Sequence, residues 1–335
     1  MKYTSFGKTG LRVSQVVLGT GNFGTGWGYG SDPDASKAVF DAYAEAGGNF
    51  IDTADIYQFG QSEEFIGTLL AGRREDFVLA TKFTNGALPN ANRLVTGNSR
   101  KAMVASVEAS LKRLKTDRID IYWAHHPDGV TPTEEIIRGF EDLARAGKIL
   151  YAGLSNFPAW RLSRAVTLAE LARAVPIAAA QFEHSLVHRE PEADLFPASH
   201  ALGLGIVTWS PLGGGMLTGK YRQGEKGRAE GLGGQVFQPE NSPQRTQTLD
   251  TVLNIAGELG VNAGQVAIAW AGTHGAFPII GPRSLAQLTD NLGALSLELS
   301  TEHISRLDAV SSLPSSTPTR TPVPWATGDV PWTAA

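Results

Sequence analysis

The sequence of 335 residues contains no cysteine. This absence excludes disulfide scaffolds, thiol catalysis, iron–sulfur clusters and cysteine-ligated zinc sites. The sequence also has no apolar run of about 18 residues, the length that a membrane-spanning helix needs. Its N-terminus, MKYTSFGKTGLRVSQVVLG, lacks the continuous apolar stretch of a signal peptide. We therefore expect a cytoplasmic protein that does not bind a membrane.

The chain also lacks a large excess of either charge, since 29 basic residues nearly balance 33 acidic ones. Charged residues make up 19% of the chain, and the formal net charge is −4 at pH 7. This balance argues against a broad surface for nucleic acid or anionic lipid. Hydrophobic residues make up 42%, which is ordinary for a globular protein, and a chain of this length can bury a large core.

Eight short β-rich runs recur along the chain, at 16–18, 49–52, 77–82, 119–123, 151–155, 177–181, 206–209 and 277–280. Helical patterns with readable ends lie between them. One begins at Ser31-Asp32-Pro33 and ends at Gly47-Gly48. Spacings of roughly 30 residues suit strand–helix units with right-handed crossovers. The pattern predicts a (β/α)8 TIM barrel. A doubly wound sheet is the alternative, because a sequence does not reveal strand order.

We expect residues 1–335 to form one barrel domain with three additions. A hairpin of residues 3–6 and 11–14, joined by Gly7-Lys8-Thr9-Gly10, is expected to cap the barrel floor. The Gly-rich, polar residues 221–247 predict a long loop after the seventh strand, of a composition that suits a lid. Residues 313–335, rich in Pro and Thr, predict an extended C-terminal tail.

Four chemically compatible side chains follow three consecutive strands. Asp52 ends the second strand and Tyr57 lies five residues further on, while Lys82 ends the third and His125 the fourth. A free tyrosine has a pKa near 10, and a neighbouring ammonium lowers that value. A carboxylate keeps the lysine charged, and a neutral imidazole donates a hydrogen bond to a carbonyl oxygen. Each residue alone also has an ordinary structural explanation, but the set predicts a general acid and a polarising group at one carbonyl.

Several longer stretches carry a resemblance to a known family. They are Asn49 to Tyr57, Thr81-Lys82, Ile119 to His125, Gly147 to Asn156 and Trp209-Ser210-Pro211-Leu212. The chain resembles the aldo-keto reductases, in the branch of aryl-alcohol-dehydrogenase-like and potassium-channel-β-subunit-like members. The resemblance runs from the N-terminal hairpin to about residue 292, and it implies the same (β/α)8 barrel.

The resemblance implies roles for individual residues. Tyr57 would be the proton donor, Lys82 held by Asp52 would lower its pKa, and His125 would orient a substrate carbonyl. The residues implied to bind the cofactor are Gly21, Asp52, Ser155, Asn156, Gln181, Trp209, Ser210, Leu212, Gly213, Gly215, Gly281, Arg283, Gln287 and Asn291. Arg283 suits the 2′-phosphate of NADPH (NADP+), since a guanidinium carries charge and a flat face.

The predicted loops contain candidate residues for a substrate pocket, and they also contain two motifs that resemble a dinucleotide site and a metal site. We expect Trp27, Tyr29 and His126 to line the pocket for a small carbonyl substrate. The run Gly19-x-Gly21-x-x-Gly24 formally matches a dinucleotide fingerprint, but the glycine-rich residues after it do not open a helix. His184 and His188 are four residues apart with no evident third ligand, so we expect no metal.

The leading hypothesis is an NADP-dependent aldo-keto reductase of the alcohol dehydrogenase type, which reduces an aldehyde or ketone to an alcohol. One alternative is an NADPH-binding regulatory module with slow turnover, since channel β-subunits share the resemblance. Another is a dedicated biosynthetic ketoreductase. The oligomeric state is not specified by any coiled coil or repeat in the sequence.

Overall fold

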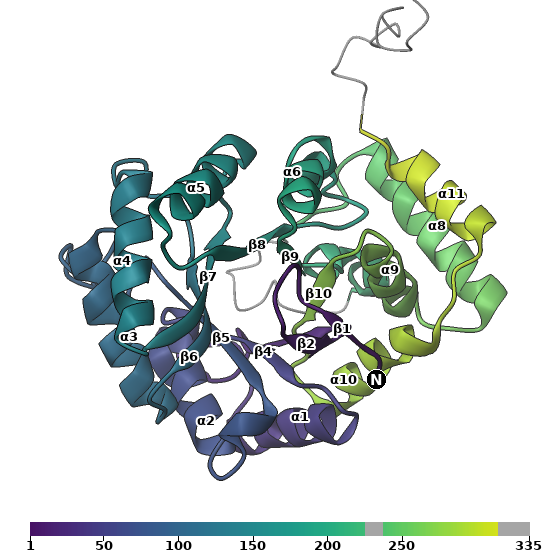
Figure 1. Ribbon diagram of the computed structural model, residues 1–335. Coiled ribbons are helices and arrows are strands. Elements are labelled where there is room, and N and C mark those ends of the chain that lie inside the picture. The colour runs from purple at the N-terminus through teal and green to yellow at the C-terminus, as the bar shows by residue number, and fades with distance from the viewer. Residues whose placement is uncertain (225–236, 314–335) are drawn as a thin grey trace, which may run out of the picture.

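The computed structural model describes residues 1–224 and 237–313. Ten strands are found in these residues: β1 (Tyr3–Ser5), β2 (Arg12–Ser14), β3 (Val17–Gly19), β4 (Phe50–Asp52), β5 (Val78–Phe83), β6 (Ile119–Ala124), β7 (Ile149–Ser155), β8 (Ile177–Glu183), β9 (Gly205–Trp209) and β10 (Phe277–Ile280). The last eight form a closed barrel in the order β10-β3-β4-β5-β6-β7-β8-β9, and every neighbouring pair is parallel (Figure 1). The predicted (β/α)8 barrel is confirmed, and the doubly wound alternative is wrong.

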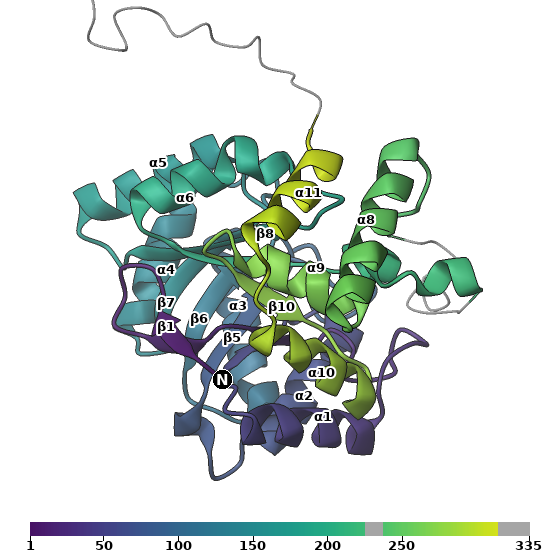
Figure 2. The same cartoon turned by 90° about the vertical axis from the view of Figure 1, so that its right-hand side faces the viewer.

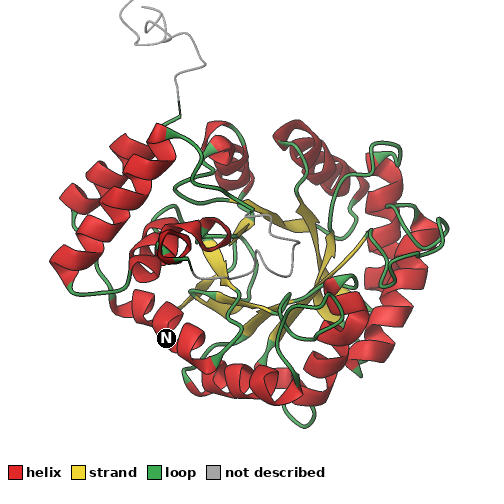
Figure 3. Cartoon of the chain, turned by 180° about the vertical axis from the view of Figure 1, so that it is seen from behind, coloured by secondary structure: helices red, strands yellow, loops and turns green. Residues whose placement is uncertain are grey.

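Helices surround the strands on all sides, as the view from behind shows (Figure 3). They are α1 (Pro33–Glu45), α2 (Gln61–Leu69), α3 (Arg100–Leu114), α4 (Thr133–Arg145), α5 (Ala159–Ala172), α6 (Leu195–Leu202), α8 (Pro243–Leu259), α9 (Ala263–Gly272), α10 (Leu285–Gly293) and α11 (Thr301–Ser311). Their ends follow local chemistry. Asp32 caps α1 by accepting a hydrogen bond from the Ala35 amide, and Pro33 is the first helical residue, as the sequence predicted.

The core has two main layers because the strands are buried on both faces. Inside the barrel lie side chains such as Phe50, Ile121, Trp123 and Val207. Between barrel and helices lie those of Leu18, Leu79 and many others. Trp123 is fully buried, and only a glycine at position 153 fits beside it, since a Cβ there would lie 2.4 Å from the indole. The interior is therefore a packed core, and the strand ends are left to form a site.

The N-terminal hairpin of β1 and β2 is antiparallel and lies at one end of the barrel (Figure 2). Phe6 in its turn is fully buried and packs edge-on against Phe50, with ring centroids 5.4 Å apart. The Lys8 amide donates to the Gly203 carbonyl, two residues before β9 begins. The hairpin therefore covers the amino ends of the strands, as predicted for a floor cap.

The segment predicted as a long loop contains regular structure at its edges. A short 3-10 turn, Lys220–Gln223, follows a 3-10 helix at Gly213–Thr218. Helix α8 begins at Pro243, because Ser242 accepts a hydrogen bond from the Arg245 amide and proline suits the first turn. The loop therefore ends earlier than the expected residue 247. Residues 225–236 and the tail from 314 lie outside the described part of the chain.

No helix in the described residues is long and apolar enough to cross a membrane.

Candidate active site

The four predicted side chains meet at the carboxyl ends of neighbouring strands. Asp52 is the last residue of β4, Lys82 lies near the end of β5, and His125 directly follows β6. Tyr57 opens the 3-10 turn Tyr57–Gly60 that leads into α2. The parallel order β4-β5-β6 makes these strands adjacent, so residues far apart in sequence converge at one mouth of the barrel.

Lys82 connects the acid to the phenol. Its side chain is fully buried, and Nζ donates hydrogen bonds to Asp52 Oδ2, to the Thr53 carbonyl at 2.9 Å and to Tyr57 Oη at 3.2 Å. Burial by itself lowers the pKa of Lys82, but the Asp52 carboxylate and Tyr57 outweigh it, and the net direction is upward. The lysine is thus held charged, with its three donors directed to fixed partners.

Asp52 is oriented from a second side. The Gln181 amide, from β8 across the barrel, donates to Asp52 Oδ1 at 3.0 Å. Both carboxylate oxygens therefore accept hydrogen bonds, which a buried carboxylate needs. Gln181 also lines the cavity above, so one side chain both contacts Asp52 and faces the cavity.

His125 stands beside the phenol. The two rings are nearly perpendicular, with centroids 6.0 Å apart. Burial, the Lys82 ammonium and the neighbouring His126 all lower the pKa of His125 well below its usual range. The imidazole is therefore neutral at physiological pH, and one of its two ring nitrogens still carries a proton that it can donate to a carbonyl oxygen. His126 stacks on it in parallel, with centroids 4.3 Å apart.

One cavity of about 700 Å³ extends from this mouth, a volume in the range of small-molecule and cofactor sites. The predicted residues that line it are Gly21, Trp27, Tyr29, Asp52, Tyr57, His125, His126, Asn156, Gln181, Trp209, Ser210, Leu212, Gly215, Gly281, Gln287 and Asn291. Four other predicted residues lie outside the lining: Lys82, Ser155, Gly213 and Arg283. Lys82 and Ser155 are fully buried, and each hydrogen-bonds a lining residue.

Trp209 and Asn156 line the cavity and contact one another. The indole N–H donates to Asn156 Oδ1 at 3.1 Å, which fixes the orientation of that amide. Asn156 has a left-handed backbone (φ 60°), and its Nδ2 donates to the His125 carbonyl at 2.9 Å. Nδ2 also lies 3.2 Å from His126 Nδ1. Asn156 therefore links the rings near Tyr57 to the tryptophan.

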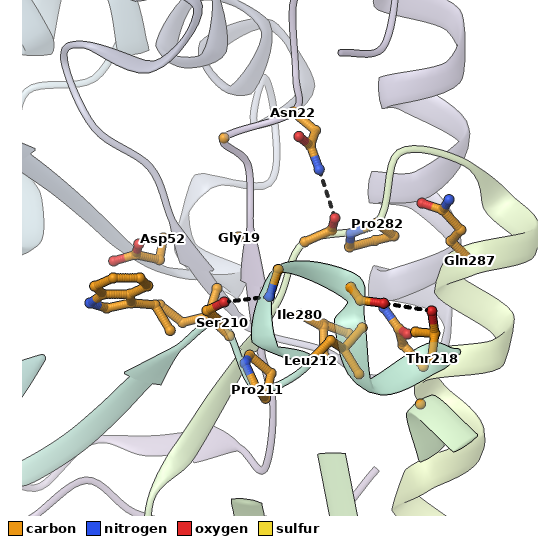
Figure 4. Close-up of a pocket in the computed structure, with 18 of the residues that line it drawn as sticks. Gly19, Asn22, Asp52, Ser210, Pro211, Leu212, Thr218, Ile280, Pro282 and Gln287 are labelled. Atoms are coloured by element: carbon orange, nitrogen blue, oxygen red, sulfur yellow. Dashed lines mark hydrogen bonds between the residues drawn. The ribbon is translucent and has the colours of Figure 1, made fainter. Parts of the chain in front are cut away.

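Past Trp209 the chain forms a tight glycine turn (Figure 4). Gly213, Gly214 and Gly215 all have positive φ, a run that side chains would strain. Ser210 Oγ accepts from the Gly214 amide at 2.9 Å and holds the turn closed. Gly214 and Gly215 line the cavity, and Pro282 and Gln287 of the β10–α10 segment line its far end.

Arg283 lies at that far end, with its guanidinium 4.7 Å above the ring of Tyr29. The two loops involved are tied together, because Asn22 Nδ2 donates to the Gly281 carbonyl and Ser31 Oγ donates to the Arg283 carbonyl. Tyr29 therefore contacts the predicted 2′-phosphate residue, while Trp27 lies edge-on to Tyr57 with centroids 6.0 Å apart.

Gln58 is a site residue that the sequence reasoning missed. It is fully buried, and its side-chain amide binds the carbonyls of Gly21 and Tyr29 and the amide of Trp27. It thus holds the first βα loop over Tyr57. The loop contains so many glycines because it wraps closely around Gln58: a Cβ at Gly24 would lie 2.7 Å from the Gln58 Cβ, and one at Gly26 would lie 2.6 Å from the Gln58 carbonyl oxygen. The motif is a loop, as expected, and no helix begins in it.

Lys220 was also missed, and it lines the cavity next to the glycine turn. A Cβ built at Gly215 would lie 3.0 Å from Lys220 Nζ. A cation just beyond a glycine-rich turn is a recognisable sequence signal for an anion site, and Gly219-Lys220 carries it. Asn262 and Asp290, which bind one another at 3.1 Å, complete the wall at this end.

The histidine pair from the sequence is arranged differently. His184 Nε2 lies 2.8 Å from Glu192 Oε1, and His274 Nε2 lies 3.6 Å from the same oxygen, so these three, and not His188, form a potential ligand group in the described residues. Arg189 donates to both oxygens of Glu192, which places a cation where a metal would bind. The group fits a hydrogen-bonded cluster that joins β8 to α9.

Comparison with known proteins agrees with this geometry. The Aldo/keto reductase family model matches residues 15–312. The chain is 37% identical to the uncharacterized oxidoreductase YrpG of Bacillus subtilis, over 92% of this chain and 96% of that protein. It is 34% identical to the aryl-alcohol dehydrogenase [NADP(+)] of Phanerodontia chrysosporium, over 89% and 83%. It is also 34% identical to a probable voltage-gated potassium channel subunit beta of rice, Oryza sativa subsp. japonica, over 92% and 96%.

The barrel, its strand-end side chains and these relatives define an oxidoreductase built on a (β/α)8 barrel. More narrowly, the chain belongs to the Aldo/keto reductase family. The family expected from the sequence is confirmed, and so is the branch of aryl-alcohol dehydrogenases and channel β-subunits.

Proposed function

We propose that this protein reduces an aldehyde or ketone to an alcohol with NADPH as hydride donor. The observation that carries the proposal is the continuous hydrogen-bonded series from Asp52 through Lys82 to Tyr57, which ends at the floor of the 700 Å³ cavity beside a neutral His125. Three groups therefore converge on one point: Tyr57 as the proton donor, the Lys82 ammonium to stabilise the phenolate, and His125 as a hydrogen-bond donor to the carbonyl oxygen.

The residues divide the chemistry as follows. A bound reduced nicotinamide would supply the hydride to the carbonyl carbon. Tyr57 gives its hydroxyl proton to the carbonyl oxygen as charge develops there. The Lys82 ammonium, 3.2 Å from Tyr57 Oη, stabilises the phenolate that remains. His125 donates a hydrogen bond to the same oxygen and so orients the carbonyl.

The cavity residues fit a phosphorylated dinucleotide. Trp209 offers an aromatic face near the catalytic end, and the glycine turn 213–215 with Lys220 offers a close-approach surface and a cation for a pyrophosphate. Arg283 supports a preference for NADPH over NADH, because its guanidinium needs only to leave the Tyr29 ring to meet a 2′-phosphate. The relative from Phanerodontia chrysosporium carries NADP(+) in its name.

The first experiment is a fluorescence titration of the purified protein with NADPH and NADH. Seven tryptophans, with Trp209 in the cavity wall, provide the signal. We expect quenching at micromolar NADPH or below and much weaker quenching by NADH. Turnover is then tested by a screen of aromatic and short-chain aldehydes, in which the oxidation of NADPH is the measured signal. Failure to bind either cofactor contradicts the proposal.

A regulatory module is the second candidate, because one relative is named as a channel β-subunit. The two functions differ in flux. Steady NADPH consumption with simple aldehydes supports the reductase, whereas tightly retained cofactor with negligible consumption supports the module. A dedicated biosynthetic reductase would be slow on generic aldehydes and yet lose all activity on Tyr57→Phe.

A further inference from the structure

We propose that Asn85 is a positioning residue that holds His125 in the tautomer with its proton on Nε2. The proposal rests on the proposed carbonyl reduction, since it explains how His125 comes to present a donor to the substrate. No sequence motif singled out Asn85, which lies in the loop between β5 and α3.

The contact that carries the proposal joins the two side chains directly. Asn85 Nδ2 lies 3.2 Å from His125 Nδ1. An amide NH2 group has only hydrogens to offer, so Nδ1 must be the acceptor. In a neutral imidazole the single proton is then on Nε2. Because His125 lines the cavity, that N–H is the group available to a carbonyl oxygen.

The charges around the ring keep it neutral. Lys82 on β5 and the adjacent His126 both oppose a second proton, and Tyr57 from the turn before α2 faces the ring edge-on. Electrostatics alone, however, do not choose between the two neutral tautomers. A specific partner at Nδ1 is required for that choice, and Asn85 supplies it.

The backbone is built to deliver Asn85 to this place. The preceding residue, Thr84, has φ of +117°, a conformation that is costly for a β-branched side chain. Its hydroxyl donates to Asn98 Oδ1 at 2.6 Å and lies 3.2 Å from the His125 amide, from which it accepts. The strained residue therefore turns the chain at the end of β5 and also fixes the backbone of the histidine that Asn85 contacts.

The position of the His125 backbone and the protonation of its ring are therefore fixed by different residues. Thr84 and Asn156 hold its backbone, through the His125 amide and carbonyl respectively, while Asn85 sets which ring nitrogen carries the proton. With the opposite tautomer, an Nε2 lone pair would face the carbonyl oxygen and repel it.

The test replaces the amide with its acid. Asn85→Asp has nearly the same shape, but its carboxylate accepts where the amide donates. We expect the proton of His125 to move to Nδ1, and the pKa of the imidazole to rise because an anion lies beside it. Asn85→Ala, which removes the partner without reversing it, should give an intermediate effect. Asn92→Asp is the matched control, since Asn92 is exposed in the same loop and has no histidine contact among the described residues.

Two measurements separate this proposal from the proposed function. Nitrogen-15 NMR of histidine-labelled protein reads the tautomer without any substrate, and the His125 signals are assigned by their loss in His125→Gln. With NADPH and the aldehyde that gives the fastest turnover in the screen, the Asp variant should lose at least 10-fold in kcat, acquire a new ionisation in its pH profile, and bind NADPH as before.

A wild-type spectrum with the proton on Nδ1 overturns the proposal. So does an Asp variant whose tautomer and pH profile match those of wild type, or one whose tautomer changes while kcat does not. Absence of any turnover in wild type contradicts the proposed function instead, and the NMR result still decides the tautomer.

Discussion

Replacing Asp55 with asparagine should make the protein more stable at neutral pH. Asp55 lies three residues after the end of β4 and is buried, and neither of its carboxylate oxygens has a hydrogen-bond partner among the described residues. Burial, together with the nearby Glu63, raises the pKa of Asp55 from 3.8 to about 7. The folded protein therefore holds a proton that the unfolded chain releases at a much lower pH.

The sign and size of the effect follow from this difference. Between pH 4 and 7 the folded state binds more protons than the unfolded state, so the wild type loses stability as pH rises. The slope for one proton is about 1.4 kcal/mol per pH unit. The difference between the pKa of 3.8 in the unfolded chain and about 7 in the folded protein thus lowers the free energy of unfolding of the wild type by roughly 4 kcal/mol between low pH and pH 8. An asparagine has no such proton to lose, and any cost of its unpaired amide does not vary with pH.

Urea unfolding followed by tryptophan fluorescence at pH 5, 6, 7 and 8 measures the difference. We expect the free-energy difference between Asp55→Asn and wild type to grow in favour of the variant by about 1.4 kcal/mol per pH unit up to about pH 6, and by progressively less through pH 7. Parallel curves for the two proteins would refute the reasoning, whatever their offset.

Asp128→Asn is the control for this experiment. Asp128 accepts hydrogen bonds from Asn98, Val130 and Thr131, and although burial opposes them, these bonds lower the pKa of the carboxyl. Its contribution to stability is therefore complete above its ordinary value near 4. The Asp128→Asn variant should be less stable than wild type by an amount that stays constant from pH 5 to 8.

Three further predictions concern the cavity and the ion pairs. Tyr57→Phe should lower kcat at least 10²-fold and leave the NADPH Kd nearly unchanged, as steady-state kinetics and titration will show; an active variant contradicts its role as proton donor. Arg283→Ala should weaken NADPH binding by about 1.5–3 kcal/mol and hardly affect NADH; equal losses in the two titrations refute contact with the 2′-phosphate. Burial raises the pKa of Glu192, but hydrogen bonds from His184 and Arg189 outweigh it and lower the pKa to about 2. The stability that the Glu192 carboxylate contributes is therefore lost as pH falls from about 4.5 to 2. Acid unfolding of Glu192→Gln should lack this loss of stability.

The fold was predictable because each barrel unit is local. The eight β-rich runs correspond to β3 through β10, with starts displaced by at most two residues, since a strand buried on both faces needs an apolar run that nothing else nearby resembles. The number and spacing of the units favoured a barrel, but the strand order that excludes a doubly wound sheet became known only from the structure. The beginning of α8 was missed because Ser242-Pro243 lies in a stretch rich in Gly, Pro and polar residues, where a short cap signal is easily overlooked.

The site was predictable where chemistry lies at the end of a strand. Asp52, Lys82 and His125 all occupy such positions, so knowing the barrel was enough to bring them together. Gln58 was not predictable in this way. Its role depends on a left-handed backbone (φ 51°) and on a loop that is 29 to 37 residues away in sequence, and a glutamine beside a tyrosine has no distinctive pattern.

Two of the residues that the sequence did not reveal, Gln58 and Asn85, share one property: each acts by fixing the position of another part of the site. Gln58 holds the loop that covers Tyr57, and Asn85 contacts Nδ1 of the His125 ring. Such residues are amides, which are common on surfaces and carry no charge to mark them. The structure identifies them by paired donors and acceptors, and by strain at the neighbouring backbone of Thr84. A reactive side chain can therefore be predicted from its position at the end of a strand. The residue that fixes its tautomer, or that holds a loop over it, can be identified only when the folded loops are seen.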